Sequence, residues 1–262
     1  LIKDAIDFIE KIHGIKVDIN SIDENDPKAM KLFHDAETIG IFQFESEGMR
    51  AFLKELKPSR FDDLIAANSL FRPGPMNEIP NYIKYRHNPD QVTYVHEKLS
   101  DILDVTYGVI VFQEQVMQIV QKLAGFSLGE ADNLRRAMGK KKMAVMEENR
   151  KYFVYGKLDE GGKILVPGCI RNGVDEKTAN KIYDLMLDFA KYAFNKSHSA
   201  AYSYVAMQTA WLKAYYPTEY FAALLSSVMG ILQRFNSILK RPRSLELRSW
   251  DQVSTIPIKS SL

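Results

Sequence analysis

Segments in which apolar residues recur at helical spacing follow one another along most of the chain, and glycine or proline separates them. Residues 1–13 carry isoleucine and alanine along one face and stop at Gly14. Asp26 and Pro27 open the next helix, because proline is favoured at the first helical position. Further helices are expected over residues 49–56, 113–124, 128–138, 143–153, 175–190 and 199–215. A chain of this kind buries its apolar stripes by packing helix on helix.

Few segments are typical of β structure. Tyr107-Gly-Val-Ile-Val-Phe112 is the best strand candidate, and residues 38–45 are expected to be extended. Residues 156–173 are rich in glycine and are expected to be irregular. The sequence therefore predicts a mainly α fold with a few short strands.

Several classes of protein are excluded by composition. Cys169 is the single cysteine, so neither a disulfide framework nor a cysteine zinc cluster can form, and a cytoplasmic location is expected. No apolar run approaches the roughly 18–20 residues that a membrane helix needs, so no membrane partner is expected. The first residues do not resemble a signal peptide. They include no initiator methionine and begin inside a helical pattern, which predicts that the chain is part of a longer protein.

The net charge of +2 is unevenly distributed. The segment from Ile231 onward has six basic and two acidic residues, which leaves residues 1–230 with a net charge of −2. Any binding of nucleic acid by the body must therefore depend on local basic clusters.

One such cluster lies around the end of the helix expected over 128–138. Ser127 and Glu130 have the spacing of a capping box at its start, and Gly139 is expected to stop it in the left-handed conformation. Five of the eight residues from 135 to 142 are basic, among them Arg135, Arg136 and Lys140. Guanidinium groups bind phosphate oxygens bidentately, so polyphosphate is the natural ligand. Alternatively, these cations only complement the helix dipole, or residues 116–136 form a helix–turn–helix that contacts duplex DNA.

Polar residues also gather before the last of these helices, in Phe194-Asn-Lys-Ser-His-Ser-Ala-Ala-Tyr202. The backbone N–H groups at a helix N-terminus attract anions, which makes Asn195, Lys196 and His198 candidates for phosphate binding. Alternatively, Ser197 or Ser199 serves only as the helix cap, and His198 has a structural role.

Arg72 lies in Phe71-Arg-Pro-Gly-Pro-Met76, where two prolines and a glycine impose a rigid turn. Held on such a turn, Arg72 is a candidate contact for phosphate or template. No convergent carboxylates, phosphate-binding glycine loop or nucleophile–histidine pair is evident, and the adjacent Asp62 and Asp63 do not suit a metal site. The sequence predicts a binder of a phosphorylated ligand without catalytic or metal-binding residues of its own.

Five motifs in order resemble the alpha (catalytic) subunits of bacterial DNA polymerase III, of the DnaE type more than the PolC type. They are Ile39-Gly-Ile-Phe-Gln-Phe-Glu-Ser46, Arg72-Pro-Gly-Pro-Met76, Tyr107-Gly-Val-Ile-Val-Phe-Gln-Glu-Gln-Val-Met117, Leu134-Arg-Arg-Ala-Met-Gly-Lys140 and Phe194-Asn-Lys-Ser-His-Ser-Ala-Ala-Tyr202. The resemblance implies the fingers domain of a C-family DNA polymerase over residues 1–230, with the N-terminal residues at the edge of the palm. It also implies that the three metal-binding aspartates, which hold Mg²⁺, lie in the palm and outside this chain.

The same resemblance assigns roles to the candidate residues. Arg135 and Arg136 are expected to approach the triphosphate of an incoming dNTP, and Asn195, Lys196 and His198 to lie beside the nascent base pair. Lys140 and Arg72 extend this dNTP-binding set. Expected partners are dNTP, primer–template DNA, the rest of the alpha subunit, and replisome subunits (clamp, clamp loader and proofreading exonuclease) that bind through regions not present here.

Residues 231–262 follow no pattern of this family and are expected to be disordered or vector-derived. Two competing hypotheses remain beside the polymerase one. The chain could be a non-catalytic helical DNA-binding module, which would bind duplex with a steep salt dependence. It could also be a folded piece that retains neither activity on its own.

Overall fold

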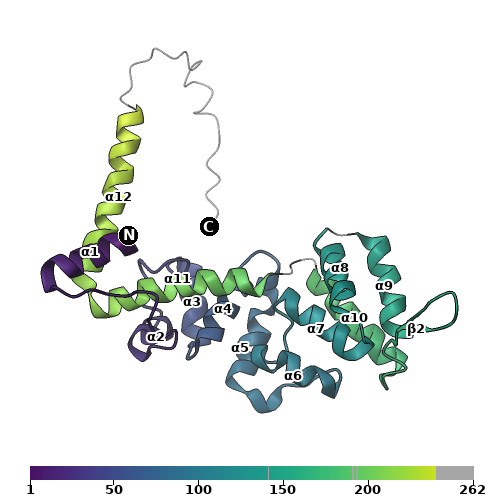
Figure 1. Cartoon of the computed structure of the whole chain (residues 1–262). Coiled ribbons are helices and arrows are strands. Elements are labelled where there is room, and N and C mark those ends of the chain that lie inside the picture. The colour runs from purple at the N-terminus through teal and green to yellow at the C-terminus, as the bar shows by residue number, and fades with distance from the viewer. Residues whose placement is uncertain (141, 191, 193, 240–262) are drawn as a thin grey trace, which may run out of the picture. The chain divides into compact units, whose positions relative to one another are not determined.

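The computed structural model describes the chain except residues 141, 191, 193 and 240–262, and it describes side chains as far as residue 229. The α-helices are α1 (Ile2–His13), α2 (Pro27–His34), α3 (Glu47–Leu56), α4 (Phe61–Leu70), α5 (Ile79–His87), α6 (Ser100–Leu103), α7 (Gln113–Ala124), α8 (Leu128–Gly139), α9 (Met143–Tyr155), α10 (Glu176–Ala190), α11 (Lys196–Tyr215) and α12 (Pro217–Leu239) (Figure 1). Short 3₁₀ turns are η1 (Pro75–Glu78), η2 (Pro89–Gln91), η3 (Glu97–Leu99) and η4 (Asp104–Thr106), and the strands are β1 (Lys157–Leu158) and β2 (Ile164–Val166). The expected mainly α fold with few strands is confirmed.

The chain divides into two compact units. Unit 1 combines residues 1–16 with the residues from 218 onward, so it joins α1 to α12. Within it, His13 Nε2 lies 2.8 Å from Glu219 Oε1. Helix α1 ends at Gly14, whose φ of 67° is left-handed as its sequence predicted.

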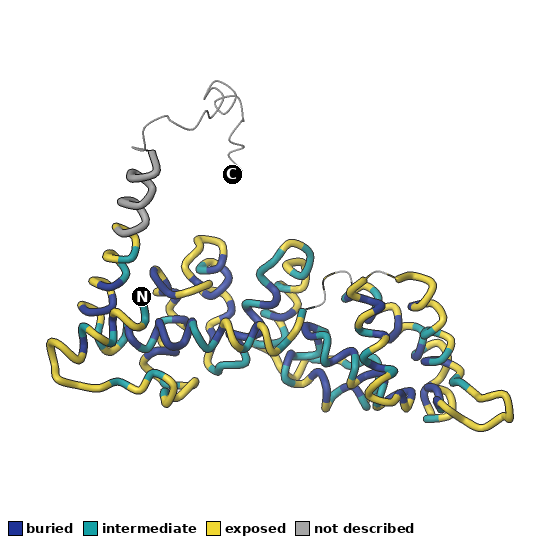
Figure 2. The backbone as a smooth tube through the Cα atoms, turned by 45° about the horizontal axis from the view of Figure 1, so that its top comes forward, coloured by how far each residue is buried: buried dark blue, intermediate teal, exposed yellow. Residues whose placement is uncertain are grey.

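Unit 2 comprises residues 17–217 and contains two hydrophobic cores. The first is formed by α2, α3 and α4, with the middle of α11 packed along α4 and α2. Asp26 caps α2 by accepting the N–H of Ala29, and Ser46 caps α3 by accepting the N–H of Met49. Figure 2 shows the buried positions gathered where the helices meet and the exposed ones on loops such as that between β1 and β2.

The second core lies among α7, α8, α9 and α10. The predicted capping box is present, because Ser127 Oγ accepts the N–H of Glu130 while Glu130 Oε2 accepts the N–H of Ser127. Gly125 separates α7 from α8 with a φ of 76°, and a side chain there would clash with Pro167. The expected left-handed stop at Gly139 is wrong: Gly139 is the last residue of α8 and Lys140 is the C-cap, with a φ of −92°.

The expected strand over 107–112 is also wrong. Only Phe112 forms a bridge, a parallel one with Phe194. The buried side chain of Gln115 replaces a neighbouring strand: its Oε1 accepts the N–H of Val111 at 2.8 Å and the N–H of Phe112 at 3.0 Å. Because these buried amides are satisfied locally, no strand partner is needed.

The other departures from expectation are local. Residues 38–45 form consecutive turns, in which Thr38 Oγ1 donates to the carbonyl of Phe44 at 2.6 Å, and they are not extended. The glycine-rich stretch expected to be irregular contains the β1–β2 hairpin. Helix α12 continues to Leu239, so the first residues of the segment expected to be disordered are helical. Residues 240–262 lie outside the described part of the chain, and the prediction for them stays a prediction.

Candidate functional site

The N-termini of α7 and α11 meet at the bridge between Phe112 and Phe194. The N–H of Gln113 donates to the carbonyl of Phe194 at 2.9 Å. Asn195 then caps α11, because its Oδ1 accepts the N–H of His198 at 2.9 Å. Helix α11 therefore begins three residues earlier than Ser199, the expected start. The structure also gives Asn195 the capping role that the sequence had offered to Ser197 or Ser199.

Glu114 places a carboxylate directly on this helix N-terminus. Its Oε1 accepts from Asn195 Nδ2 at 2.9 Å, and its Oε2 lies 3.0 Å from the backbone nitrogen of Lys196. Negative charge is favourable at the N-terminus of a helix, where the backbone N–H groups have no partner within the helix. Glu114 shows that the N-terminus of α11 accommodates an anion, which is the property expected of a phosphate site.

Arg135 lies next to this junction. Its Nη1 donates to Gln113 Oε1 at 3.2 Å, while its Nε and Nη2 donate to Asp132 Oδ1 at 2.8 and 2.7 Å. Arg136 shares the same carboxylate, with its Nε 2.7 Å from Asp132 Oδ2. The hydrogen bonds from Arg135, followed by that from Arg136, lower the pKa of Asp132. Asp132 therefore stays ionised and bridges the two guanidinium groups on the surface of α8.

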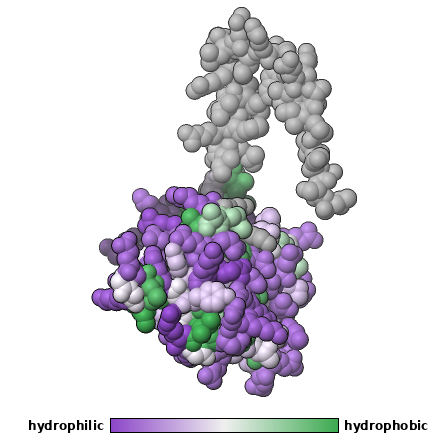
Figure 3. Space-filling view, turned by 90° about the vertical axis from the view of Figure 1, so that its right-hand side faces the viewer, coloured by the Kyte–Doolittle hydropathy of each residue, from purple (hydrophilic) through white to green (hydrophobic). Residues whose placement is uncertain are grey.

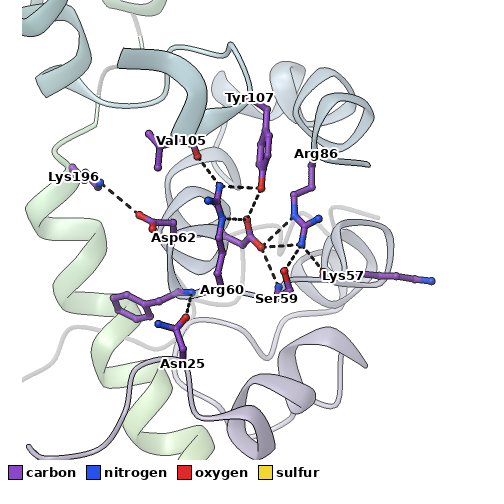
Figure 4. Close-up of polar contacts among 11 residues, drawn as sticks. Asn25, Lys57, Ser59, Arg60, Asp62, Arg86, Val105, Tyr107 and Lys196 are labelled. Carbon is purple, nitrogen blue, oxygen red and sulfur yellow. Dashed lines mark hydrogen bonds and ion pairs between the residues drawn. The ribbon is translucent and has the colours of Figure 1, made fainter. Parts of the chain in front are cut away.

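The side chain of Lys196 points toward α4. Its Nζ lies 3.6 Å from Asp62 Oδ1 (Figure 4). The same Nζ lies over the ring of Phe112, 5.6 Å from the centroid. Both Lys196 and Asp62 are partly exposed, so the ammonium group stays within reach of solvent.

Arg72 reaches the other side of the junction from the Pro-Gly-Pro turn. Its Nη2 donates to the carbonyl of Tyr192 at 2.7 Å, and its Nε donates to that of Ser69 at 2.9 Å. The guanidinium carbon lies 4.0 Å from the ring centroid of Phe194. Partial burial lowers the pKa of Arg72, which remains a cation at any ordinary pH.

A series of rings continues from Arg72 along one pocket. The ring of Phe194 lies 5.4 Å from that of His198, His198 lies 4.4 Å from Tyr202, and Tyr202 lies 5.4 Å from Phe42. Arg72 and all four of these residues line a pocket of about 650 Å³, which also includes Asn68 and Ser199. Flat aromatic faces beside a guanidinium group suit the stacking of a nucleobase.

Arg136 and Lys140 line a different pocket, between α8, α9 and the hairpin. It has a volume of about 470 Å³ and also includes Lys142 and Lys157. Figure 3 shows the face of the molecule on this side, which is mainly hydrophilic with small apolar patches. The structure thus brings Arg72, Asn195, Lys196 and His198 to one junction with Arg135 beside it, and it places Arg136 and Lys140 elsewhere.

Three residues of this arrangement were missed from the sequence: Gln113, Glu114 and Asp132. Asp132 could have been found, because its spacing of three and four residues from the arginines is that of helical ion pairs. Gln113 and Glu114 carry no such signal. The partner of Glu114 at the start of α11 lies more than 80 residues away along the chain.

Asp63 is fully buried, unlike its neighbour Asp62. Its carboxylate accepts hydrogen bonds from Arg60, Arg86 and the N–H of Ser59, and Tyr107 Oη lies 3.4 Å away (Figure 4). The burial of the phenol, together with the charge of Asp63, raises the pKa of Tyr107. This network ties α4 and α5 to the segment that leads into α7. The two aspartates therefore diverge and serve structural contacts.

Among the residues that the structure describes, no group of three or more His, Cys, Asp or Glu side chains is placed to hold a metal ion. The residues present thus do not fit Mg²⁺ within the described part of the chain.

Among the described residues, none of the helices combines the length and the apolar character needed to cross a membrane.

Comparisons with known proteins show the family of the chain. The family described as the bacterial DNA polymerase III alpha subunit finger domain matches residues 1–161. The chain is 45% identical over 248 residues to DNA polymerase III subunit alpha of Bacillus subtilis (strain 168), which covers 95% of the chain and 21% of that relative. It is 46% identical over 230 residues to the subunit alpha of Staphylococcus aureus (strain COL), which covers 88% of the chain and 20% of that relative.

The chain therefore belongs to the bacterial DNA polymerase III alpha subunit family, and the matched region is its finger domain. The resemblance inferred from the five motifs is confirmed. The chain spans about one fifth of the length of these curated relatives. The family match ends at residue 161, so the expected domain boundary at 230 stays a prediction.

Proposed function

We propose that this chain is the dNTP- and template-positioning part of a replicative DNA-directed DNA polymerase, which transfers a nucleotidyl group from dNTP to the primer 3′ end. The observation that supports this most directly is the junction of α7 and α11. There Arg135 reaches Gln113, and Gln113 pairs with the segment that caps α11. A guanidinium group and the N-terminus of a helix that already binds a carboxylate thus lie next to each other.

The chemistry of this reaction needs mainly positioning and neutralisation of charge, because the triphosphate carries most of the negative charge that develops. In the proposal, Arg135 and Lys196 contact the triphosphate, while the rings of His198 and Phe194 support the base. Arg72 holds the carbonyl of Tyr192 and stacks on Phe194, so it fixes the position of that ring. Template pairing, and no side chain of this chain, selects the base.

Mg²⁺ would be bound by aspartates in another part of the subunit and would supply the clamp on the attacking and leaving oxygens. No residue of the described part is assigned to it. The chain alone is therefore expected to be inactive in nucleotide addition.

The test is Arg135→Ala in the full-length subunit, assayed for single-nucleotide addition on a primer–template with Mg²⁺. Loss of one electrostatic donor should lower kcat/KM for dNTP by about 10²–10³-fold, with primer–template affinity unchanged. Arg135→Lys should recover only part of this loss, because lysine cannot reproduce the guanidinium fork. Lys54→Ala, on the exposed face of α3, is the matched control and should have no effect. Unchanged kcat/KM in a correctly folded Arg135→Ala subunit would refute the proposal.

The alternative function, a DNA-binding module acting through residues 116–136, is less well supported by the structure. Its recognition helix would be α8, and the exposed polar face of α8 must then enter a major groove. The residues Glu130, Asn133 and Arg136 on that face instead line the pocket shared with α9 and the hairpin, together with the C-cap residue Lys140. A steep salt dependence of duplex affinity that decreases in Arg136→Ala would favour the module.

The partners follow from the same proposal. Primer–template DNA and the rest of the alpha subunit would bind the finger domain, and the clamp, clamp loader and proofreading exonuclease would bind regions outside this chain. The cytoplasmic location also stays a prediction.

A further inference from the structure

We infer that the pocket between α8, α9 and the β1–β2 hairpin is a second phosphate site, which binds the sugar–phosphate backbone of a DNA strand separately from the dNTP site at Arg135. Four cationic residues from three different elements line it: Arg136, Lys140, Lys142 and Lys157. The inference rests on the proposed function and deepens it, because it names a place where the finger domain would hold a DNA strand apart from the dNTP.

The acidic residues that line this pocket are too few to balance its basic residues. Glu130 and Glu148 are its two acidic residues, and both are engaged by nearby donors. Glu130 Oε2 accepts from the N–H and Oγ of Ser127, at 2.9 and 2.7 Å, and Glu148 accepts from the hydroxyl of Tyr152. Four cations against two carboxylates leave an excess of positive charge, which favours an anion.

The lysines have few partners of their own. Within the described part of the chain, the ammonium groups of Lys140 and Lys142 have neither a hydrogen bond nor an ion pair. Arg136 uses only its Nε for Asp132, at 2.7 Å, so its two Nη groups remain able to donate. Lys157 Nζ lies over the ring of Tyr152, 4.8 Å from the centroid. Several strong donors therefore remain available at one pocket.

Helix stabilisation explains only part of this cluster. Cations at the C-terminus of α8 complement its dipole, which accounts for Arg136 and Lys140. Lys142, however, is the N-cap of α9 and makes no side-chain cap hydrogen bond. A cation beside the positive end of a helix is unfavourable for stability. Its presence there indicates a ligand whose negative charge offsets the repulsion.

The surroundings favour a nucleic-acid backbone over a free nucleotide. Phe126 and Tyr152 are the aromatic residues of the pocket. Phe126 is buried in the core, and Tyr152 has its hydroxyl on Glu148 and Lys157 Nζ over its ring, so the pocket offers no stack of aromatic rings to a base. Cations without a stacking platform bind phosphates and read no sequence. The pocket thus suits a strand held by its phosphates.

The experiment measures binding of a fluorescent oligothymidylate to this 262-residue chain by anisotropy at several salt concentrations. For the double variant Lys142→Ala/Lys157→Ala, we expect the affinity to fall about tenfold at low salt. The slope of log K against log salt should decrease by about 1.4, since each phosphate contact on a single strand contributes about 0.7. The control Lys54→Ala/Lys177→Ala removes two exposed lysines that lie outside this pocket.

Two further arms separate this site from the dNTP site. Arg135→Ala should leave the slope of log K against log salt for oligothymidylate unchanged. A changed slope would show that Arg135 and this pocket belong to one site. Inorganic tripolyphosphate and dTTP should compete with the oligonucleotide only weakly. An unchanged slope in the double variant, with the circular-dichroism melting curve of the parent, overturns the inference. So does competition by dTTP that is stronger than that by the oligonucleotide itself.

Discussion

The carboxylate of Glu114 caps the N-terminus of α11, with its Oε2 3.0 Å from the backbone nitrogen of Lys196. This contact joins two helices whose first residues are more than 80 positions apart in the chain. It also places an internal anion where the proposed function puts a phosphate. The Glu114 carboxylate would therefore compete with the phosphate for the N-terminus of α11, and it also holds α7 and α11 together.

Glu114→Gln tests both roles. The neutral amide keeps an acceptor but loses the charge–dipole attraction, so the free energy of unfolding should fall by roughly 0.3–1 kcal/mol. Affinity for inorganic tripolyphosphate should rise by about the same energy, or roughly two- to fivefold. Urea denaturation and isothermal titration measure the two quantities. Glu176→Gln, at the first turn of α10, is the matched control and should leave tripolyphosphate affinity as it was. A decrease in affinity would show that Glu114 supports ligand binding.

Asp63 and Asp62 are adjacent but should respond very differently to removal of their charge. Asp63→Asn leaves Arg60 and Arg86 without their buried partner and should cost about 3 kcal/mol of unfolding free energy. Asp62→Asn breaks only a partly exposed ion pair with Lys196 and should cost less than about 1 kcal/mol. Guanidinium denaturation of both variants provides the measurement. Equal losses of unfolding free energy in the two variants would mean that the hydrogen bonds of Asp63 contribute little to stability.

Gln115→Met should be strongly destabilising although methionine has a similar size. The buried amides of Val111 and Phe112 lose their acceptor, at about 1–3 kcal/mol for each group. Hydrogen exchange should become faster at these two amides in particular. Gln118→Met, on the exposed side of the same helix, should leave both stability and exchange unaffected.

Cys169 should report on opening of the second core. It is fully buried, and its burial raises the pKa of the thiol from 9.0 to about 12. In the folded chain the thiol should therefore not react with a disulfide reagent at pH 9, and it should react as soon as denaturant exposes it. Because the unfolded thiol ionises near pH 9 while the folded one does not, its contribution to stability is present below pH 9 and decreases as the pH rises toward 12. Cys169→Ala should lack this dependence, and rapid reaction of the native chain would show that the core opens readily.

The sequence by itself determined many of the helices and some of the residues that cap them. Asp26, Ser46 and Ser127 each cap their own helix by accepting the N–H of the residue three positions later, so their role is readable from local spacing. The pairing of Asp132 with Arg135 and Arg136 is local in the same way. The motifs also sufficed to establish the family, since several short patterns in a fixed order are far more specific than any one of them.

Only the tertiary structure decided which residues share a site. The run from Tyr107 to Phe112 has the composition of a strand, yet the side chain of Gln115 satisfies its amides and leaves one bridge to Phe194. That bridge, and not any local pattern, sets Glu114 against Lys196. The adjacent Arg135 and Arg136 point to different sites because neighbouring residues on a helix project about 100° apart. Contacts between distant segments depend on how the helices pack in the two cores. The spacing of residues along the sequence does not predict that packing.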